Sequence, residues 1–264
     1  MQPRSDDRRP GDGKQPSDAK RFTGDPQPNP SLLLERIGIR APLIGFYDAP
    51  DPSPFEPFVE PPAQGHACIF AFYHRWLEGK MLHLTRDNFG CGGAGMWMCG
   101  VQSRPRAAMV DFLVNEEGLK ASPELMEEWL DAIRPYQPRH AHLFVGPLRE
   151  SQYEWLRTIT FHVPPDQLGM LALGAQYHAS PRDPVPVLAP FGSGCMQIAG
   201  AFPDFDAPQA VIGATDIAMR QYLAPDLLAF TVTKPMFEQL CALDERSFLF
   251  KPFWERLRKA RAAV

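Results

Sequence analysis

Residues 158–178, TITFHVPPDQLGMLALGAQYH, decide the fold because the hydrophobic pattern changes in the middle of this stretch. Residues 159–163 are a short run of bulky side chains that is typical of a β-strand. Residues 164–177 follow at once with helical character and begin with two prolines, which are favoured in the first turn of a helix. A strand that passes directly into a helix indicates an α/β protein.

The same alternation of short strands and helices extends in both directions from this stretch. We predict strands at 42–47, 80–84, 142–148, 159–163, 185–190, 210–214 and 227–233. We predict helices at 31–39, 66–76, 104–119, 122–133, 164–177, 195–201, 236–243 and 252–262. The apolar run at 66–76 also fits a buried strand, and the helix is the favoured reading. The order of these elements predicts a single-domain α/β fold with a mixed β-sheet covered by helices.

Three regions of different composition divide the chain. Residues 1–30 are rich in Pro, Asp, Arg and Gly with almost no aliphatic side chains, so we expect a disordered N-terminal arm. Residues 31–245 form the predicted α/β domain, and residues 246–264 form a C-terminal amphipathic helix with a basic face. The proline-rich loop at 50–62, with Phe55 and Phe58, is expected to lie extended on the surface.

Composition and charge limit the classes of function. The 264 residues are 44% hydrophobic and 22% charged, which is ordinary for a soluble globular protein. A net charge of -4 gives no basic surface for nucleic acid, and no apolar run is long enough to cross a membrane. Five cysteines are an odd number, and residues 1–30 lack the apolar core of a secretory signal, so we expect a cytoplasmic protein.

Two glycine-rich loops carry cysteines. The first reads Cys91-Gly92-Gly93-Ala94-Gly95 and is followed by Cys99-Gly100; the second reads Gly192-Ser193-Gly194-Cys195. A backbone without side chains lets an anion or a cofactor approach the amide N–H groups, and the thiols supply ligands or a nucleophile. We therefore predict a binding site where the two loops meet, with Gly92, Gly93, Gly95, Gly192 and Gly194 as cofactor-binding residues.

Residues 31–243 resemble the uncharacterised ArCR family, domain of unknown function 169. The likeness lies in the order of motifs: a short helix, the strand APLIGF at 41–46, Cys68, the loop CGGA at 91–94, VGPL at 145–148, residues 158–178, GSGC at 192–195 and GATD at 213–216. The resemblance implies a soluble prokaryotic protein with matching cysteines at 68, 91 and 195, and it implies no settled activity. The long arm, the loop at 50–62 and Cys99 depart from the family pattern.

Four cysteines match the number that an iron–sulfur cluster requires. We predict Cys68, Cys91, Cys99 and Cys195 as metal ligands, although only Cys91 and Cys99 are close in sequence, with seven residues between them. Three thiolates would leave one iron open as a Lewis acid for a small-molecule ligand, whereas four would favour electron transfer to a redox partner. The oligomeric state, and whether the protein is an enzyme, stay open.

Two alternatives use the same thiols without a cluster. In the first, the protein is a non-catalytic ligand-binding or regulatory module whose cysteines pack as small apolar side chains, as we expect for Cys241. In the second, it is a metal-free thiol-dependent enzyme in which Cys195, at a helix start, is the nucleophile. Zinc is disfavoured because no cysteines are spaced two to four residues apart. In the thiol-dependent enzyme, the general base that acts with Cys195 would be one of the histidines: His66, His74, His83, His162 or His178.

Two further pairs have a simple structural interpretation. His140 and His142 alternate at a strand start and can face a metal from one side, but a solvated loop edge is the favoured reading. Asp216 and Arg220 are four residues apart, which predicts a helical ion pair, with a clamp for a substrate carboxylate as the alternative use of Arg220.

Overall fold

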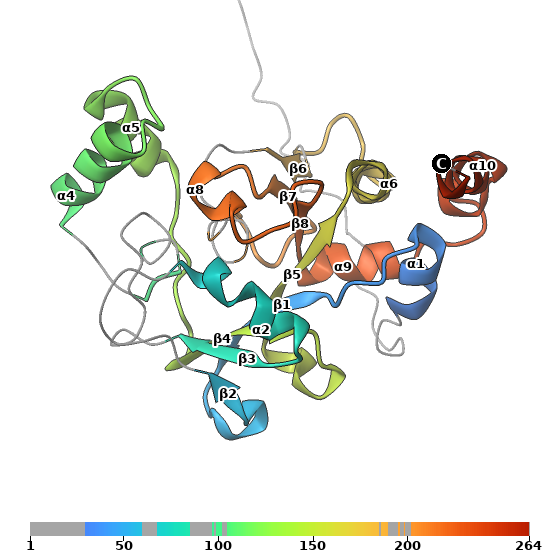
Figure 1. Ribbon diagram of the computed structural model, residues 1–264, viewed down its shortest axis with the longest axis horizontal. Helices are drawn as coiled ribbons and strands as arrows, with labels where there is room; N and C mark the ends of the chain where they lie inside the picture. The colour runs from blue at the N-terminus through green and yellow to red at the C-terminus, as the bar shows by residue number, and fades with distance from the viewer. Residues whose placement is uncertain are drawn as a thin grey trace, which may run out of the picture.

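The computed structural model describes residues 30–59, 68–84, 97, 99–101, 105–184, 186–189, 195, 198 and 202–263. Within these residues one sheet contains eight strands in the order β2-β3-β4-β1-β5-β8-β7-β6 (Figure 1). The strands are β1 (Ile44–Ala49), β2 (Phe58–Val59), β3 (Met81–Leu84), β4 (His142–Pro147), β5 (Leu156–Val163), β6 (Val187–Leu188), β7 (Ala210–Gly213) and β8 (Leu228–Thr233).

The sheet is mixed, as predicted. β1 lies at its centre and pairs antiparallel with β4 and β5, and the β3–β4, β5–β8 and β7–β8 pairs are also antiparallel. The two outermost pairs, β2–β3 and β6–β7, are parallel. Helices cover the sheet, so the predicted fold class, a single α/β domain with a mixed sheet, is confirmed.

The helical elements agree with most of the predicted ranges. They are α1 (Pro30–Ile37), η1 (Ser53–Phe55), η2 (Ile69–Phe72), α2 (Tyr73–Leu77), α4 (Arg106–Asp111), the π-helical η3 (Phe112–Glu116), α5 (Pro123–Ala132), η4 (Glu150–Trp155), α6 (Pro165–Gln176), α8 (Ile217–Arg220), α9 (Lys234–Cys241), η5 (Phe248–Phe250) and α10 (Pro252–Ala262). Of the helix predicted at 195–201, only residues 195 and 198 are described, and both are helical. The predicted disordered arm lies outside the described residues, apart from Pro30.

The two faces of the sheet bury different clusters. Strand β5 shows the division, because Ile159, Phe161 and Val163 point into one core with α1, α6, α9 and α10, whereas the alternate side chains point to the other face. We call the first face the helix face. Gly174 of α6 allows close packing there, since a Cβ at this position would lie 2.6 Å from Cδ2 of Leu240 on α9 and the leucine would have to shift.

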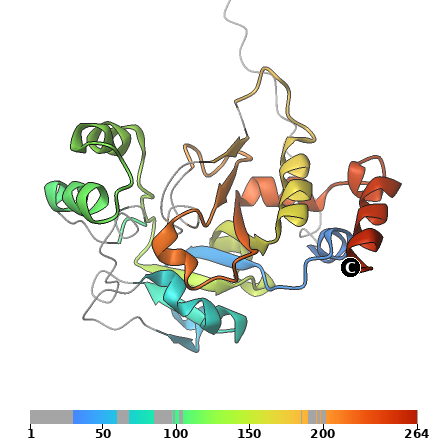
Figure 2. The ribbon, with the colours of Figure 1, turned by 45° about the horizontal axis from the view of Figure 1, so that its top comes forward.

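The opposite face is covered by η2, α2 and α8, together with short segments around residues 99–101, 195 and 198. We call it the cysteine face, because three cysteines contact its core. A third and smaller core lies between α4 and α5, which stand apart from the sheet in both views (Figures 1 and 2). Arg106 joins these helices through hydrogen bonds to Glu127 and Asp131.

The proline-rich loop is not an extended surface segment, so that prediction is wrong. Phe55, in η1, is fully buried and stacks on Phe144 of β4, with ring centroids 4.1 Å apart and planes 4° from parallel. Phe58 begins the edge strand β2 and packs at the edge of the same Phe144 ring. This proline-rich segment therefore supplies an aromatic side chain, Phe55, to the core.

No helix in the described part of the chain is both long enough and apolar enough to span a bilayer.

Candidate functional site

Three of the four cysteines predicted as ligands contact one apolar cluster on the cysteine face. Cys68 is half-buried and directly precedes η2, whereas Cys99 and Cys195 are 0% and 2% exposed. The three residues come from segments far apart in the sequence, yet all pack against the same core, which includes Ile69 and Phe70. The fold therefore gathers these thiols over one face of the sheet.

The remaining predicted site residues cannot be placed. Cys91, Gly92, Gly93, Gly95, Gly192 and Gly194 lie outside the described residues. Among the residues that are described, no three His, Cys, Asp or Glu side chains form a group that could hold a metal ion.

A row of buried polar side chains runs along the sheet beneath these cysteines. Thr158, Thr160 and His162 are the alternate residues of β5 that point away from the helix face, and all are at most 3% exposed. Thr160 Oγ1 lies 2.8 Å from Oγ1 of Thr231 on β8. Thr158 donates a hydrogen bond to the carbonyl oxygen of Ile198, which fixes the segment of Cys195 to the sheet. The cysteine face therefore buries a row of polar groups beside its apolar core.

His162 is the polar group of this row that lacks a hydrogen-bond partner. Among the described residues neither ring nitrogen has a hydrogen-bond partner, and the ring lies among aromatic side chains, 4.8 Å from Tyr73 and 6.0 Å from Phe70 between centroids. Burial lowers the pKa of His162 to about 3, so the imidazole is neutral at physiological pH. A neutral buried imidazole with both nitrogens unsatisfied is suited to a ligand that supplies a hydrogen bond or a metal.

The loop after β7 has a strained backbone. Ala214 is buried with φ of 62°, a left-handed conformation that side chains other than glycine rarely adopt and that clusters at functional sites. Asp216 then caps α8 by accepting a hydrogen bond of 2.8 Å from the amide of Ala218. Arg220 donates to the backbone carbonyls of four residues of this loop and the next: Ala214, Ala224, Pro225 and Leu227.

The predicted ion pair between Asp216 and Arg220 is therefore wrong. The carboxylate is used as a helix cap and the guanidinium as a brace for backbone carbonyls, so Arg220 is not placed as a clamp for a substrate either. Asp216 instead faces Glu117, just after η3. Burial, and then the charge of Asp216, raise the pKa of Glu117 to about 6, and burial also raises the pKa of Asp216.

His140 and His142 do not act together. His140 donates its backbone amide to Oδ1 of the buried Asp48, and its ring Nδ1 lies 3.1 Å from the same oxygen. Asp48 also accepts hydrogen bonds from the Tyr136 hydroxyl and the Arg139 amide, so it organises the turn before β4. The His142 ring instead meets His83 of β3, with 3.1 Å between Nδ1 and Nε2.

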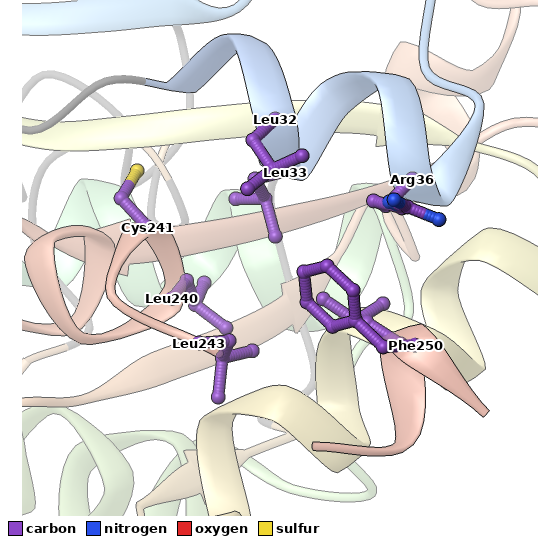
Figure 3. A pocket seen from close by; sticks show the side chains of 8 residues that line it. Leu32, Leu33, Arg36, Leu240, Cys241, Leu243 and Phe250 are labelled. Atoms are coloured by element: carbon purple, nitrogen blue, oxygen red, sulfur yellow. The ribbon is translucent and has the colours of Figure 1, made fainter. Parts of the chain in front are cut away.

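Cys241 lies on the helix face, where it packs against the core as predicted. Burial, and then the charge of Glu238, raise the pKa of its thiol to about 12, so it stays protonated. It borders a small pocket between α1, α9 and η5 that is apolar except for Arg36, with Leu33, Leu240 and Phe250 among its walls (Figure 3). This pocket lies apart from the cysteine face.

Residues 36–242 match the family model described as uncharacterised ArCR. The chain belongs to this family. The match covers most of the chain and confirms the resemblance seen in the motifs, and the family's description gives no activity. No match was found among curated proteins or among solved structures.

Sequence reasoning missed several residues of this face. Nothing in the sequence singles out Thr158, Thr160 and Thr231, because threonine is common in strands. The spacing of two residues between Thr158, Thr160 and His162 on β5 is the signal that could have placed them on one face. Glu117 gave no signal, because its environment comes from a loop almost one hundred residues later in the chain.

Proposed function

We propose that the protein binds an iron–sulfur cluster on the cysteine face, with Cys68, Cys91, Cys99 and Cys195 as the ligands. In this proposal the cluster serves a redox reaction or the transformation of a small molecule. The observation that supports it is the convergence of Cys68, Cys99 and Cys195 on one buried core from three distant segments. Cys91 lies outside the described residues and is included because it stands eight residues before Cys99 in the same glycine-rich stretch of sequence.

The chemistry of the donors fits such a group. Thiolates are the usual ligands of iron–sulfur clusters, and backbone amides of glycine-rich loops hydrogen-bond the sulfides. The first loop supplies Gly92, Gly93 and Gly95, and the second supplies Gly192 and Gly194. When bound, the cluster would supply electron transfer, or a Lewis-acidic iron if one position is free of thiolate.

The other polar residues of this region would handle protons and orient a ligand. His162 is neutral and offers one donor and one acceptor nitrogen from the middle of the face. The carboxyl group of Glu117, with a pKa of about 6, can take up or release a proton near neutral pH. Burial under η2 and α2 keeps bulk water away from His162.

A second function is favoured by the burial of the thiols. Cys99 and Cys195 are 0% and 2% exposed within an apolar cluster, which is how cysteine behaves when it packs as a small hydrophobic side chain. In that case the protein is a ligand-binding or regulatory module whose site is the row of Thr160, Thr231 and His162 rather than the thiols.

Iron and acid-labile sulfide analysis of protein purified without oxygen separates the two. We expect matched iron and sulfide in the wild type, and their loss in Cys91→Ala and Cys195→Ala. Cys241→Ala is the matched control, since that thiol lies on the helix face, and it should keep the wild-type content. Equal metal content in all three variants would reject the assigned ligands, and a metal-free wild type would favour the packing alternative.

A further inference from the structure

Two histidines meet at the other end of the sheet, near the β2 edge. β3 and β4 are antiparallel, with His83 directly opposite Phe144. His142 lies two residues before Phe144 on β4, so it shares a face with His83 and is its diagonal neighbour. The two rings are tilted by 34°, with centroids 5.2 Å apart, and Nε2 of His83 lies 3.1 Å from Nδ1 of His142.

Aromatic packing holds His83 in this position. Its ring stacks on Phe144, with centroids 4.6 Å apart and planes 19° from parallel, and contacts Phe58 edge-on at 4.9 Å. The side chain is only 5% exposed, whereas His142 is half-buried and lies at the start of its strand. His83 is thus held in place by its neighbours, and His142 is the more accessible ring of the pair.

The separation of the two nitrogens is the one that a shared metal ion imposes. Zinc binds imidazole nitrogen at about 2.0–2.1 Å, and ligand angles of roughly 90–110° then place two nitrogens about 2.9–3.4 Å apart. The observed 3.1 Å lies within this range. A direct hydrogen bond between two neutral imidazoles has the same length, so the surroundings decide between them.

A carboxylate within electrostatic reach of His142 favours a cation. Hydrogen bonds from the Ser53 amide and hydroxyl lower the pKa of Asp51, and His142 makes a smaller electrostatic contribution. Ser53 donates both of these bonds to Oδ1, at 2.9 and 2.7 Å, and so holds Asp51 in place. A metal held by two neutral imidazoles would be stabilised by this fixed negative charge.

We propose that Nε2 of His83 and Nδ1 of His142 bind a divalent transition metal of the zinc class, with water in the open positions and Asp51 as the neighbouring anion. The described residues supply these two ligands, and the remaining positions are available to an anionic ligand. The site lies on the face opposite the cysteine core, because His83 alternates on β3 with Leu82 and Leu84, which belong to that core. It is independent of the proposed cluster.

Binding of Zn²⁺ and Co²⁺ to the full-length, tag-free protein tests the site. We expect His142→Gln to weaken Zn²⁺ binding at least about tenfold by calorimetry, with His83→Gln showing the same loss. The exposed His178, after α6, gives the control His178→Gln, which should bind like the wild type. Since His142 is half-buried at the start of β4, its variant decides the outcome even if His83→Gln fails to fold.

The Co²⁺ spectrum separates this site from the cysteines. Imidazole and water ligands give weak visible bands, whereas thiolates add an intense charge-transfer band in the near ultraviolet. We expect the weak bands to persist in Cys195→Ala and to disappear in His142→Gln. Zn²⁺ binding that is unchanged in His142→Gln, or a Co²⁺ spectrum with thiolate bands alone, would overturn the proposal.

Discussion

At the scale of single residues, the cysteine face is distinguished by polar groups in places that usually hold apolar ones. Asp48 shows how the fold normally treats such a group, because its buried carboxylate accepts hydrogen bonds from Tyr136, Arg139 and His140. His162 is equally buried, and neither of its nitrogens has a partner in the part of the chain that the structure describes. Burying a polar group without a partner costs roughly 1–3 kcal/mol of folding free energy. A protein tolerates this cost more readily where a bound ligand supplies the missing hydrogen bond.

His162 should make the protein less stable in acid. The folded pKa is about 3 and the unfolded pKa about 6.5, so only the unfolded chain takes up this proton between those values. Stability is therefore lost as the pH falls from about 6.5 towards 3, by about 1.5 kcal/mol between pH 6.5 and pH 5. Urea unfolding of wild type and His162→Leu at both pH values measures the difference.

We expect the variant to lack this part of the pH dependence and to be no less stable than the wild type at pH 7, because an unsatisfied polar group is removed. The same pH dependence in both proteins would show that His162 titrates normally in the folded state.

At the scale of elements, the loop between β7 and β8 depends on Arg220. Its guanidinium donates hydrogen bonds to the carbonyl of the strained Ala214, before α8, and to the carbonyls of Ala224, Pro225 and Leu227, after it. The spacing of Asp216 and Arg220 in the sequence predicted that they pair with each other, whereas each of them bonds to backbone groups. Helical spacing assumes a helix that continues, whereas α8 ends at Arg220 itself.

Arg220→Met should destabilise the protein by about 2 kcal/mol, because four backbone carbonyls lose the charged donor that they share. Arg246→Met is the matched control, since the Arg246 side chain is 83% exposed and pairs only with nearby Asp244; a loss under about 1 kcal/mol is expected there. Urea unfolding at neutral pH measures both. Equal losses in the two variants would contradict the role of Arg220 as a brace.

Elements with a clear hydrophobic period were predictable, and pairings between elements were not. β5 and α6 follow from residues 158–178 because each keeps its own period over its whole length. The burial of Phe55 was not foreseen, since the prolines around it are typical of a surface loop. The contact of His83 with His142 requires the register of β3 against β4, which a single sequence does not give.

At the scale of the whole molecule, the sheet separates two kinds of surface. The helix face buries a large apolar core that includes the packing cysteine Cys241, whereas the opposite face collects Cys68, Cys99 and Cys195 over the polar residues of β5. The glycine-rich sequence marked Cys91, Cys99 and Cys195; Cys99 and Cys195 lie on this face, whereas Cys91 lies outside the described residues. The sequence could not predict that polar residues of β5 are buried on this face, since their burial depends on which face of the sheet is covered.

The most direct test of the cluster on this face is the visible absorption spectrum of the wild-type protein, purified without oxygen and recorded before and after addition of dithionite. The proposal predicts a brown protein with broad absorption that bleaches on reduction, as iron–sulfur clusters do. A colourless protein with no change on reduction would contradict it and would leave the row of Thr160, Thr231 and His162 as the binding surface of this face.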